Sequence, residues 1–245
     1  DRLSLALYYY TDTPAIENLK ISTNATWKIP KMFQNIYPQR HMIVNECLIK
    51  EQKESYLEIG VETGYTYLNV HAKRKIGVDP DPKTKDNTII LKTSDDFFIE
   101  NNEMFDVIFI DGMHQIEYVL RDFNNSCKCL NKNGIILIDD VLPGTEEEQY
   151  KIPKNPKYEN NILKYTSPWT GDVWKFVYYL LLNHKDNITY ELYTHENYRG
   201  VLKMKFIDSV YISEENLSIM ESYDFKKDFK DYSQILVQFN LSGSS

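Results

Sequence analysis

The fold of this chain is decided by residues 55–79, SYLEIGVETGYTYLNVHAKRKIGVD. The apolar run at 56–59 predicts a strand, Gly60 and Gly64 predict a turn, and the residues after Thr66 predict a helix that leads into a second strand at 76–79. This βαβ pattern is typical of units that bind nucleoside-type ligands at the carboxyl ends of their strands. Asp79 ends the second strand, where a carboxylate can accept hydrogen bonds from both hydroxyls of a ribose.

The glycines of this turn have the spacing G-x-x-x-G and not the G-x-G-x-x-G of a dinucleotide site. Glu58, at the end of the first strand, would repel a pyrophosphate, but it suits a ligand that carries an ammonium and a sulfonium cation. These features favour S-adenosylmethionine over NAD as the ligand. The alternative is a plain strand-to-helix turn that binds nothing.

Composition limits the class of protein. The 245 residues are 42% hydrophobic, which is enough for one sizeable domain, and the net charge of −8 disfavours a nucleic-acid substrate. Cys47, Cys127 and Cys129 are too few for a disulfide framework, so we expect a reducing, cytoplasmic setting. The sequence contains no apolar run of membrane-spanning length. Because the chain does not begin with Met, it is left open whether it is part of a longer multidomain protein, and a homo-oligomer is also left open.

Three further apolar runs, at 88–91, 105–110 and 134–138, predict parallel strands, and the first of them is expected to be buried on both faces. Helical spacing predicts helices over 42–54, 115–130 and 171–183. Residues 188–193 and 200–206 are predicted to form a terminal antiparallel pair. The expected fold is therefore α/β, with a doubly wound, mostly parallel seven-stranded sheet. We expect three parts: an N-terminal cover segment (1–50), a ligand-binding core (51–206), and a C-terminal cover segment with a tail (207–245).

Acidic residues follow two strands that we expect to be neighbours. Asp111 ends the fourth strand, and Asp139 and Asp140 end the fifth, so their carboxylates should converge. Converging anions are costly unless a cation neutralises them, and oxygen ligands suit Mg²⁺ or another hard divalent cation. The alternative is that Asp111 and Asp140 are helix caps or turn residues.

His114 follows Asp111 by three residues, in the turn before the predicted helix, where it would point into the same cleft. A neutral imidazole there is suited to act as a general base. The alternative is a residue at the helix start that bonds only to the backbone.

Four more residues are weaker candidates. Ser94 and Asp95 follow the third strand, where they would either bond the adenine edge or cap the next helix. Trp169 and Asp172 lie in the segment SPWTGDVWK and would wall the acceptor pocket, although core packing is the better expectation for at least one of the two tryptophans there. Trp169 lies at the end of a long polar segment, 141–170, and Asp172 follows it. This segment is expected to be functional or disordered.

The motifs EIGVETG, GVDP, FDVIFIDGMHQIEYVLRDF, GIILIDDVLP and WTGDVWK, taken in this order, closely resemble those of class I S-adenosylmethionine-dependent methyltransferases. The nearest branch is the metal-dependent O-methyltransferases that act on sugar hydroxyls of macrolides and other glycans, such as the macrocin and mycinamicin enzymes. The resemblance covers about residues 50–206. It implies Mg²⁺-dependent O-methylation of a small-molecule or glycan acceptor, such as a sugar or glycan precursor.

The resemblance also implies a role for each matching residue. His114 would be the base, and Asp111, Asp139 and Asp140 would hold the metal. Catechol-type relatives use a lysine base and an Asp-Asn pair, so this chain departs from them. Together with the inferences from the turn, the predicted cofactor contacts are Glu58, Gly60, Val61, Gly64, Tyr65, Asp79, Ser94, Asp95 and Asp111.

Other functions compete with this one. Methyl transfer to a catechol-like molecule or another small vicinal diol remains open, as does a non-catalytic cofactor-binding module of a larger glycan-building protein. An NAD-linked oxidoreductase is disfavoured by Glu58 and by the glycine spacing.

Overall fold

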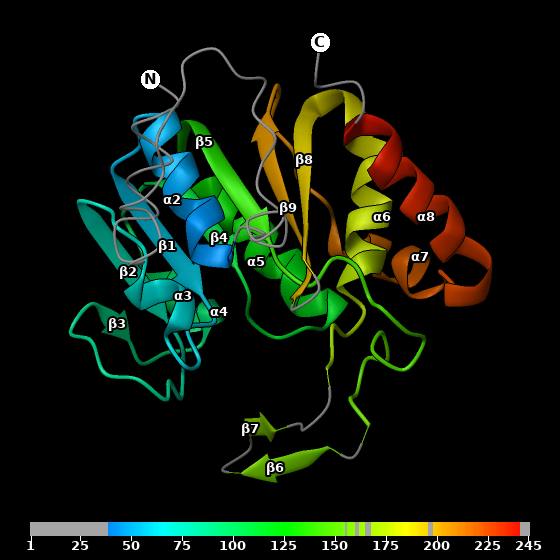
Figure 1. The fold of residues 1–245 in the computed structure, drawn as a ribbon, viewed down its shortest axis with the longest axis horizontal. Coiled ribbons are helices and arrows are strands. Elements are labelled where there is room, and N and C mark those ends of the chain that lie inside the picture. Colours follow the sequence, from blue (N-terminus) through cyan, green and yellow to red (C-terminus); the bar gives the residue numbers. More distant parts are fainter. Residues whose placement is uncertain (1–38, 155, 160–161, 165–167, 196–197, 241–245) are drawn as a thin grey trace, which may run out of the picture. The chain divides into compact units, whose positions relative to one another are not determined.

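The computed structural model describes residues 39–240 except 155, 160–161, 165–167 and 196–197, and Figure 1 shows their arrangement. Residues 1–38 of the predicted N-terminal cover segment therefore lie outside the described residues, whereas 39–50 are described. None of the helices in the described part of the chain is long and apolar enough to span a membrane.

A seven-stranded sheet forms the centre of the fold, with the strand order β3-β2-β1-β4-β5-β9-β8. The first five strands along the chain pair in parallel, whereas β9 runs antiparallel to both β5 and β8. The predicted fold class is thus confirmed, including the antiparallel closing pair. The strands are β1 (Ser55–Ile59), β2 (Arg74–Val78), β3 (Ile89–Ile90), β4 (Phe105–Ile110), β5 (Leu130–Ile138), β8 (Ile188–His195) and β9 (Tyr198–Phe206).

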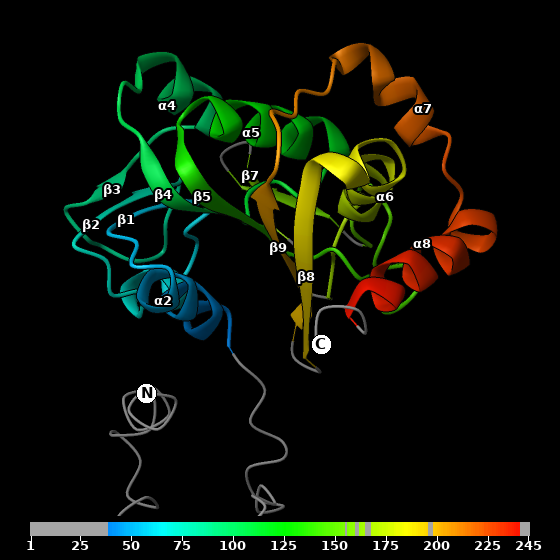
Figure 2. The same ribbon diagram turned by 90° about the horizontal axis from the view of Figure 1, so that it is seen from above.

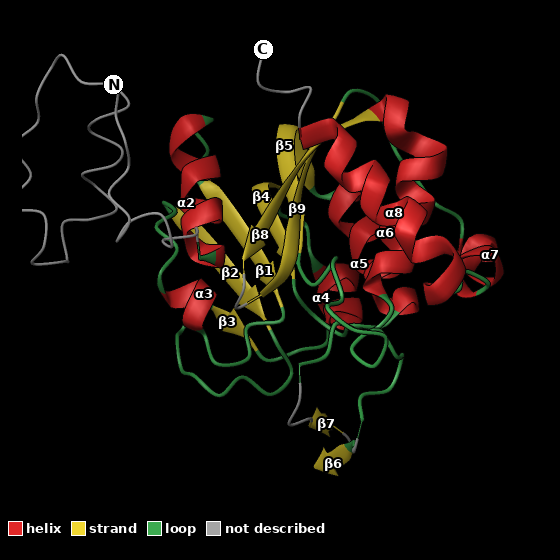
Figure 3. Cartoon of the chain, turned by 45° about the vertical axis from the view of Figure 1, so that its right-hand side comes forward, coloured by secondary structure: helices red, strands yellow, loops and turns green. Residues whose placement is uncertain are grey.

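Helices cover both faces of the sheet (Figures 2 and 3). On one face lie α2 (Arg40–Lys50) and α3 (Tyr65–Leu68), and on the other lie α4 (Ser94–Glu100), α5 (Ile116–Lys128) and α6 (Val173–His184). Beyond η2 (Lys185–Asn187) and η3 (Glu214–Asn216), the C-terminal helices α7 (Leu217–Glu221) and α8 (Phe225–Asn240) pack beside α6. The two hydrophobic cores follow the period-2 alternation of the strands: Ile108 and Ile110 belong to the core with α5 and α6, and Val107 and Phe109 to the core with α2.

Two local predictions were wrong in detail. The third strand has only two residues, and both are half-buried, because it forms the edge of the sheet and has one neighbour. The helix after Gly64 is a single short turn of four residues.

The long segment 141–170 contains a small hairpin, β6 (Lys157–Glu159) and β7 (Ile162–Lys164), which projects from the core in Figure 1.

Candidate active site

A cavity of about 1360 Å³ lies over the carboxyl ends of the parallel strands. It sits where the strand order reverses between β1 and β4, which is where ligands bind in open α/β sheets. Eleven predicted site residues line it: Glu58, Gly60, Val61, Tyr65, Asp79, Ser94, Asp95, Asp111, His114, Asp140 and Trp169. The cavity therefore brings the predicted cofactor residues and two of the three predicted metal ligands to one edge of the sheet.

At Gly60, the turn after β1 passes close to the residue that follows β4, and Gly60 lines the cavity. The Asp111 amide donates to the carbonyl of Ile59, which places the residue after β4 beside the residue after β1. Gly60 has φ +87°, and a Cβ there would lie 1.9 Å from the carbonyl oxygen of Asp111. Only glycine allows this close approach. Val61 and Tyr65 of the same turn also line the cavity, whereas Gly64 serves as the N-cap of α3 and is not among the described lining residues.

Asp79 is held in place by the backbone. Its carboxylate accepts hydrogen bonds from the Glu62 amide at 2.8 Å and from the Asp81 amide at 2.7 Å. These bonds orient the carboxylate at the end of β2, at the rim of the cavity. Glu58, at the end of β1, is buried and accepts a hydrogen bond from the hydroxyl of Tyr56. Burial, together with the charge of Asp111, raises the pKa of Glu58 well above its usual value, although the hydroxyl of Tyr56 opposes this shift.

The turn between β3 and α4 is held by α5. Arg121 donates two hydrogen bonds to Asp95, each of 3.1 Å, and Asp122 bonds the side chain of Ser94. The helix cap, which was the alternative role left open for Ser94 or Asp95, belongs to Thr93, whose hydroxyl accepts a hydrogen bond from the Asp96 amide. Ser94 and Asp95 both line the cavity, so they remain available to a ligand.

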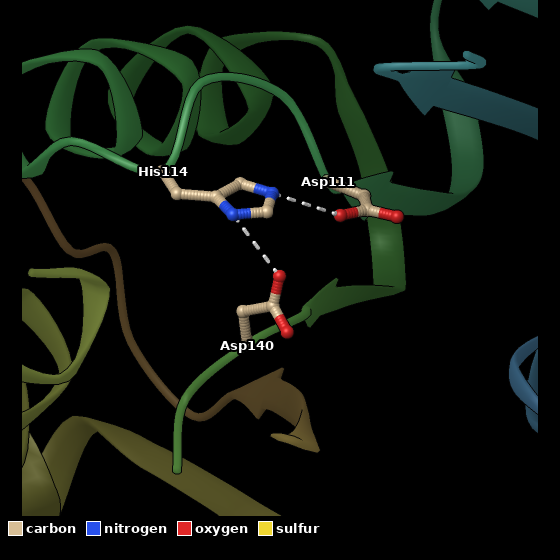
Figure 4. Close-up of side chains that lie close together, drawn as sticks. All are labelled: Asp111, His114 and Asp140. Atoms are coloured by element: carbon tan, nitrogen blue, oxygen red, sulfur yellow. Dashed lines mark ion pairs between the residues drawn. The ribbon is translucent and has the colours of Figure 1, made fainter. Parts of the chain in front are cut away.

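Asp111, His114 and Asp140 form a cluster, shown in Figure 4. The Nε2 atom of His114 lies 3.5 Å from a carboxylate oxygen of Asp111, and its Nδ1 atom lies 3.2 Å from one of Asp140. The three residues each offer one ligand atom, and these atoms all lie within 4.8 Å of one another. The three residues come from two neighbouring strand ends, as the sequence predicted.

The segment 169–172 orients His114. The backbone carbonyl of Trp169 lies 2.8 Å from Nδ1, and because a carbonyl only accepts, this nitrogen carries the hydrogen. The indole of Trp169 stacks on the imidazole with ring centres 5.0 Å apart. Gly171 has φ +56°, and a Cβ there would lie 1.5 Å from the carbonyl oxygen of His114. Burial lowers the pKa of His114, but the carboxylates of Asp140 and Asp111 raise it more, to about 9.

Asp172 has a different position from the one predicted. It is 4% exposed and is not among the described residues that line the cavity. Its carboxylate accepts a 2.8 Å hydrogen bond from the Ile116 amide at the start of α5, and its own amide donates to the carbonyl of His114. The geometry thus gives Asp172 a role in holding the His114 turn, while Trp169 does line the cavity. Trp174 is fully buried in the core, as expected for one of the two tryptophans.

Consecutive Asp139 and Asp140 differ in their surroundings. Asp140 lines the cavity and has φ +57°, a left-handed conformation that aspartate adopts more readily than most residues. Asp139 is 2% exposed and, within the described residues, is not part of the lining. Burial and the neighbouring carboxylates raise the pKa of Asp139 well above its usual value, and burial also raises that of Asp140. Keeping both residues ionised therefore requires positive charge nearby.

Sequence reasoning missed Arg40, which supplies part of that charge. It is the first residue of α2, its Nε atom pairs with Asp139, and its Nη2 atom lies 3.8 Å from Asp140. Arg40 also lines the cavity. No signal in the local sequence marks it, because α2 precedes the βαβ unit and reaches the acids only through tertiary packing.

Comparison with known proteins supports the class. Residues 57–141 match the family described as "Methyltransferase domain", a match that begins in β1 and ends one residue after Asp140. Together with the strand order, this match over residues 57–141 supports an S-adenosylmethionine-dependent methyltransferase. The comparison with curated proteins gave no match, so no particular relative narrows the class further.

Several solved structures are similar to this chain. An O-methyltransferase from Bacillus cereus, in complex with SAH, is 16% identical, with 82% of this chain and 96% of that chain covered and a TM-score of 0.47. The methyltransferase PaMTH1 from Podospora anserina, bound to SAH, is 18% identical, with coverages of 84% and 87% and a TM-score of 0.46. TomG from Streptomyces achromogenes, an O-methyltransferase of tomaymycin synthesis in complex with SAM, is 13% identical, with coverages of 84% and 89% and a TM-score of 0.45. These similarities are weak, and the fold assignment rests on the strand order.

Proposed function

We propose that this methyltransferase transfers the methyl group of S-adenosylmethionine to a hydroxyl of a sugar or glycan precursor, assisted by Mg²⁺ or another hard divalent cation. The observation that carries the proposal is the cluster of Asp111, His114 and Asp140 in the same cavity as Asp79 and Glu58. One end of this cavity suits a nucleoside with a cationic centre, and the other suits the deprotonation of an acceptor.

The cofactor end would bind S-adenosylmethionine through carboxylates. Asp79, oriented by two amide donors, would accept hydrogen bonds from the ribose hydroxyls. Ser94 and Asp95 would face the adenine, and Glu58 would face the ammonium group. A carboxylate attracts the positive charges of this ligand and disfavours a pyrophosphate, which is the reason to prefer it to NAD.

The acid end fits a divalent cation. Asp139 and Asp140 are buried, and their raised pKa values reflect burial and the repulsion between neighbouring carboxylates, both of which a bound cation relieves. Asp111 and Asp140 present oxygen ligands to the cavity, which are the donors that Mg²⁺ prefers. When bound, such a cation lowers the pKa of a coordinated hydroxyl and so makes a poor nucleophile usable near neutral pH.

His114 is the proposed proton acceptor. In the neutral form of His114, Nδ1–H faces the carbonyl of Trp169 and the lone pair is on Nε2, on the side of Asp111; a cation beside Asp111 and Asp140 would favour this form by offsetting the carboxylates that raise the pKa of His114. Nε2 would take the hydroxyl proton of the acceptor while the oxygen forms its bond to the methyl carbon. The carbon–sulfur bond breaks, its electron pair stays on sulfur, and S-adenosylhomocysteine remains. Trp169 and Pro168 line the cavity beside this histidine and would contact the acceptor.

Two measurements test the proposal. Calorimetry with S-adenosylhomocysteine and with NAD should show binding of the former alone. Turnover with a panel of nucleotide sugars and vicinal diols, with and without EDTA, should show EDTA-sensitive methylation of sugars. Tight binding of NAD alone would contradict the cofactor assignment. Methylation of catechols in place of sugars would contradict the acceptor class, and S-adenosylhomocysteine binding without turnover of any acceptor would favour a non-catalytic module.

A further inference from the structure

We propose that Arg40 is the permanent counter-ion of Asp139, so that a divalent cation at this site is held by Asp111 and Asp140 and not by Asp139. This inference rests on the cation binding suggested above and changes its ligand set. It starts from the different surroundings of the two consecutive aspartates at the end of β5.

The two consecutive carboxylates differ in whether they line the cavity. Asp140 reaches the cavity, where it contacts His114, because the left-handed backbone at this residue turns the chain. The side chain of Asp139 is 1% exposed and is paired with Arg40. Both carboxylates lie beside Arg40, but of the two only Asp140 lines the cavity and belongs to the cluster with Asp111 and His114.

The second step is the permanence of the Arg40 charge. A guanidinium stays charged at any pH that the protein meets, and its planar donors match a carboxylate. Arg40 begins α2, whose buried residues, including Val44 and Leu48, pack in the core with Val107 of β4 and Leu137 of β5. The folded core therefore anchors the helix that carries the guanidinium.

The third step is the charge balance. Asp111, Asp139 and Asp140 together carry three negative charges, and Arg40 cancels one of them. The remaining two match the charge of one divalent cation. Without Arg40, the same site would keep one uncompensated negative charge in a buried environment. Arg40 is thus a positioning residue that pairs with Asp139 and leaves the carboxylates of Asp111 and Asp140 for the cation.

The experiment measures Mn²⁺ affinity by paramagnetic resonance titration of the metal-free protein, with calorimetric S-adenosylhomocysteine binding as the check on folding. We expect Asp139→Asn to change the Mn²⁺ dissociation constant by less than about 3-fold, as for a residue outside the ligand set. Asp111→Asn and Asp140→Asn each remove a proposed metal ligand. Loss of a residue that only hydrogen-bonds to a metal ligand already lowers metal affinity by roughly 10- to 100-fold, so each of these substitutions should raise the Mn²⁺ dissociation constant by at least that factor.

Arg40→Met supplies a second, independent measurement. It frees the Asp139 carboxylate, so Mn²⁺ should bind at least as tightly as to the wild type. In the Arg40→Met background, Asp139→Asn should then weaken Mn²⁺ binding. The effects of the two substitutions on the Mn²⁺ dissociation constant would therefore be non-additive. Arg40→Lys keeps the charge and should behave like the wild type in this cycle.

The outcomes separate this inference from the proposed function. Loss of Mn²⁺ binding in Asp139→Asn to the same extent as in Asp140→Asn would overturn the inference while leaving cation binding intact. An additive cycle would overturn it too. If the wild type binds S-adenosylhomocysteine but no Mn²⁺, the cation part of the proposed function fails and this inference fails with it. If S-adenosylhomocysteine does not bind, the proposed function fails at the cofactor, whatever Mn²⁺ does.

Discussion

The two ends of the cavity hold their carboxylates in different ways. At the cofactor end, Asp79 accepts two amide hydrogen bonds and Asp95 accepts two from Arg121. At the acid end, Asp111, Asp139 and Asp140 lie close to one another and share Arg40 and His114. The protein alone thus satisfies Asp79 and Asp95, whereas the acid end keeps an excess of negative charge when His114 is neutral.

This difference indicates which end depends on an added ion. A carboxylate with backbone or guanidinium partners is stable as an anion, so the cofactor end is preformed for its ligand. Buried carboxylates that repel one another need a cation or a proton. Burial lowers the pKa of His114, but the carboxylates of Asp140 and Asp111 raise it more, to about 9, so without a cation a proton on His114 offsets part of the negative charge. The two ends should therefore respond separately to substitution.

The largest effect is expected from Asp140→Asn, which removes a carboxylate that faces the cavity. Turnover should fall by about 10³-fold or more, because several kcal/mol of cation-assisted activation are lost. The response to added Mg²⁺ should disappear, while S-adenosylhomocysteine binding measured by calorimetry stays within a few-fold of the wild type. Equal losses of turnover and cofactor binding would contradict the separation of the two ends.

The next largest effect is expected from His114→Ala. Loss of a general base costs about 10²- to 10⁴-fold in turnover. Mn²⁺ and S-adenosylhomocysteine should still bind, because the proposed metal ligands and the cofactor contacts remain. His71→Ala, at an exposed histidine, is the matched control and should leave turnover unchanged. If His114→Ala abolishes Mn²⁺ binding, His114 is a metal ligand and its assignment as the base is wrong.

Asp79→Ala tests the cofactor end. The lost hydrogen bonds to a charged acceptor are worth about 1.5–3 kcal/mol, which corresponds to a roughly 10- to 100-fold weaker dissociation constant for S-adenosylhomocysteine. Mn²⁺ affinity should not change. The control is Asp186→Ala, at an exposed aspartate outside the cavity lining. If Asp79→Ala binds S-adenosylhomocysteine as tightly as the wild type, Asp79 does not contact the cofactor.

Much of this site was predictable because strand ends are readable in the sequence. Apolar runs bounded by acids placed Asp79, Asp111 and Asp140 at one edge, and parallel pairing then brought Asp111 and Asp140 together. The charges that balance these acids were not predictable. Arg40 begins a helix outside the βαβ unit, and Arg121 and Asp122 stand on the side of α5 toward the β3–α4 turn, so their partners depend on packing between distant elements.

The segment WTGD shows a second limit. Its aromatic and acidic residues indicated an acceptor wall, which fits Trp169 but not Asp172. The requirement for Gly171 comes from its contact with the His114 carbonyl, and that contact is visible only once the loop before α6 lies against the turn before α5. Residue type suggested function here, while the positions of the backbone atoms decided which residue faces the cavity.

The last test of the cofactor end concerns Asp122 and is an effect on stability, with the smallest effect expected on turnover. This carboxyl is 2% exposed, and burial raises its pKa to about 7, although Ser94 and Arg121 oppose the shift. The folded protein thus keeps this proton to a higher pH than the unfolded chain does. The stabilising contribution of Asp122 is complete below about pH 4 and is lost as the pH rises through about 7.

The Asp122→Asn variant has no carboxyl group to ionise at this position, so its free energy of unfolding should lack this dependence on pH. Relative to the wild type, its free energy of unfolding should rise between pH 4 and pH 8 by up to about 4 kcal/mol, since each pKa unit corresponds to about 1.4 kcal/mol. Urea unfolding at several pH values measures the difference, with Asp186→Asn at an exposed site as the control. Parallel curves for Asp122→Asn and the wild type would mean that Asp122 is ionised in the folded protein. The turn that carries Ser94 and Asp95 would then be held by a charged carboxylate, and the cofactor end would contain the same kind of buried charge as the acid end.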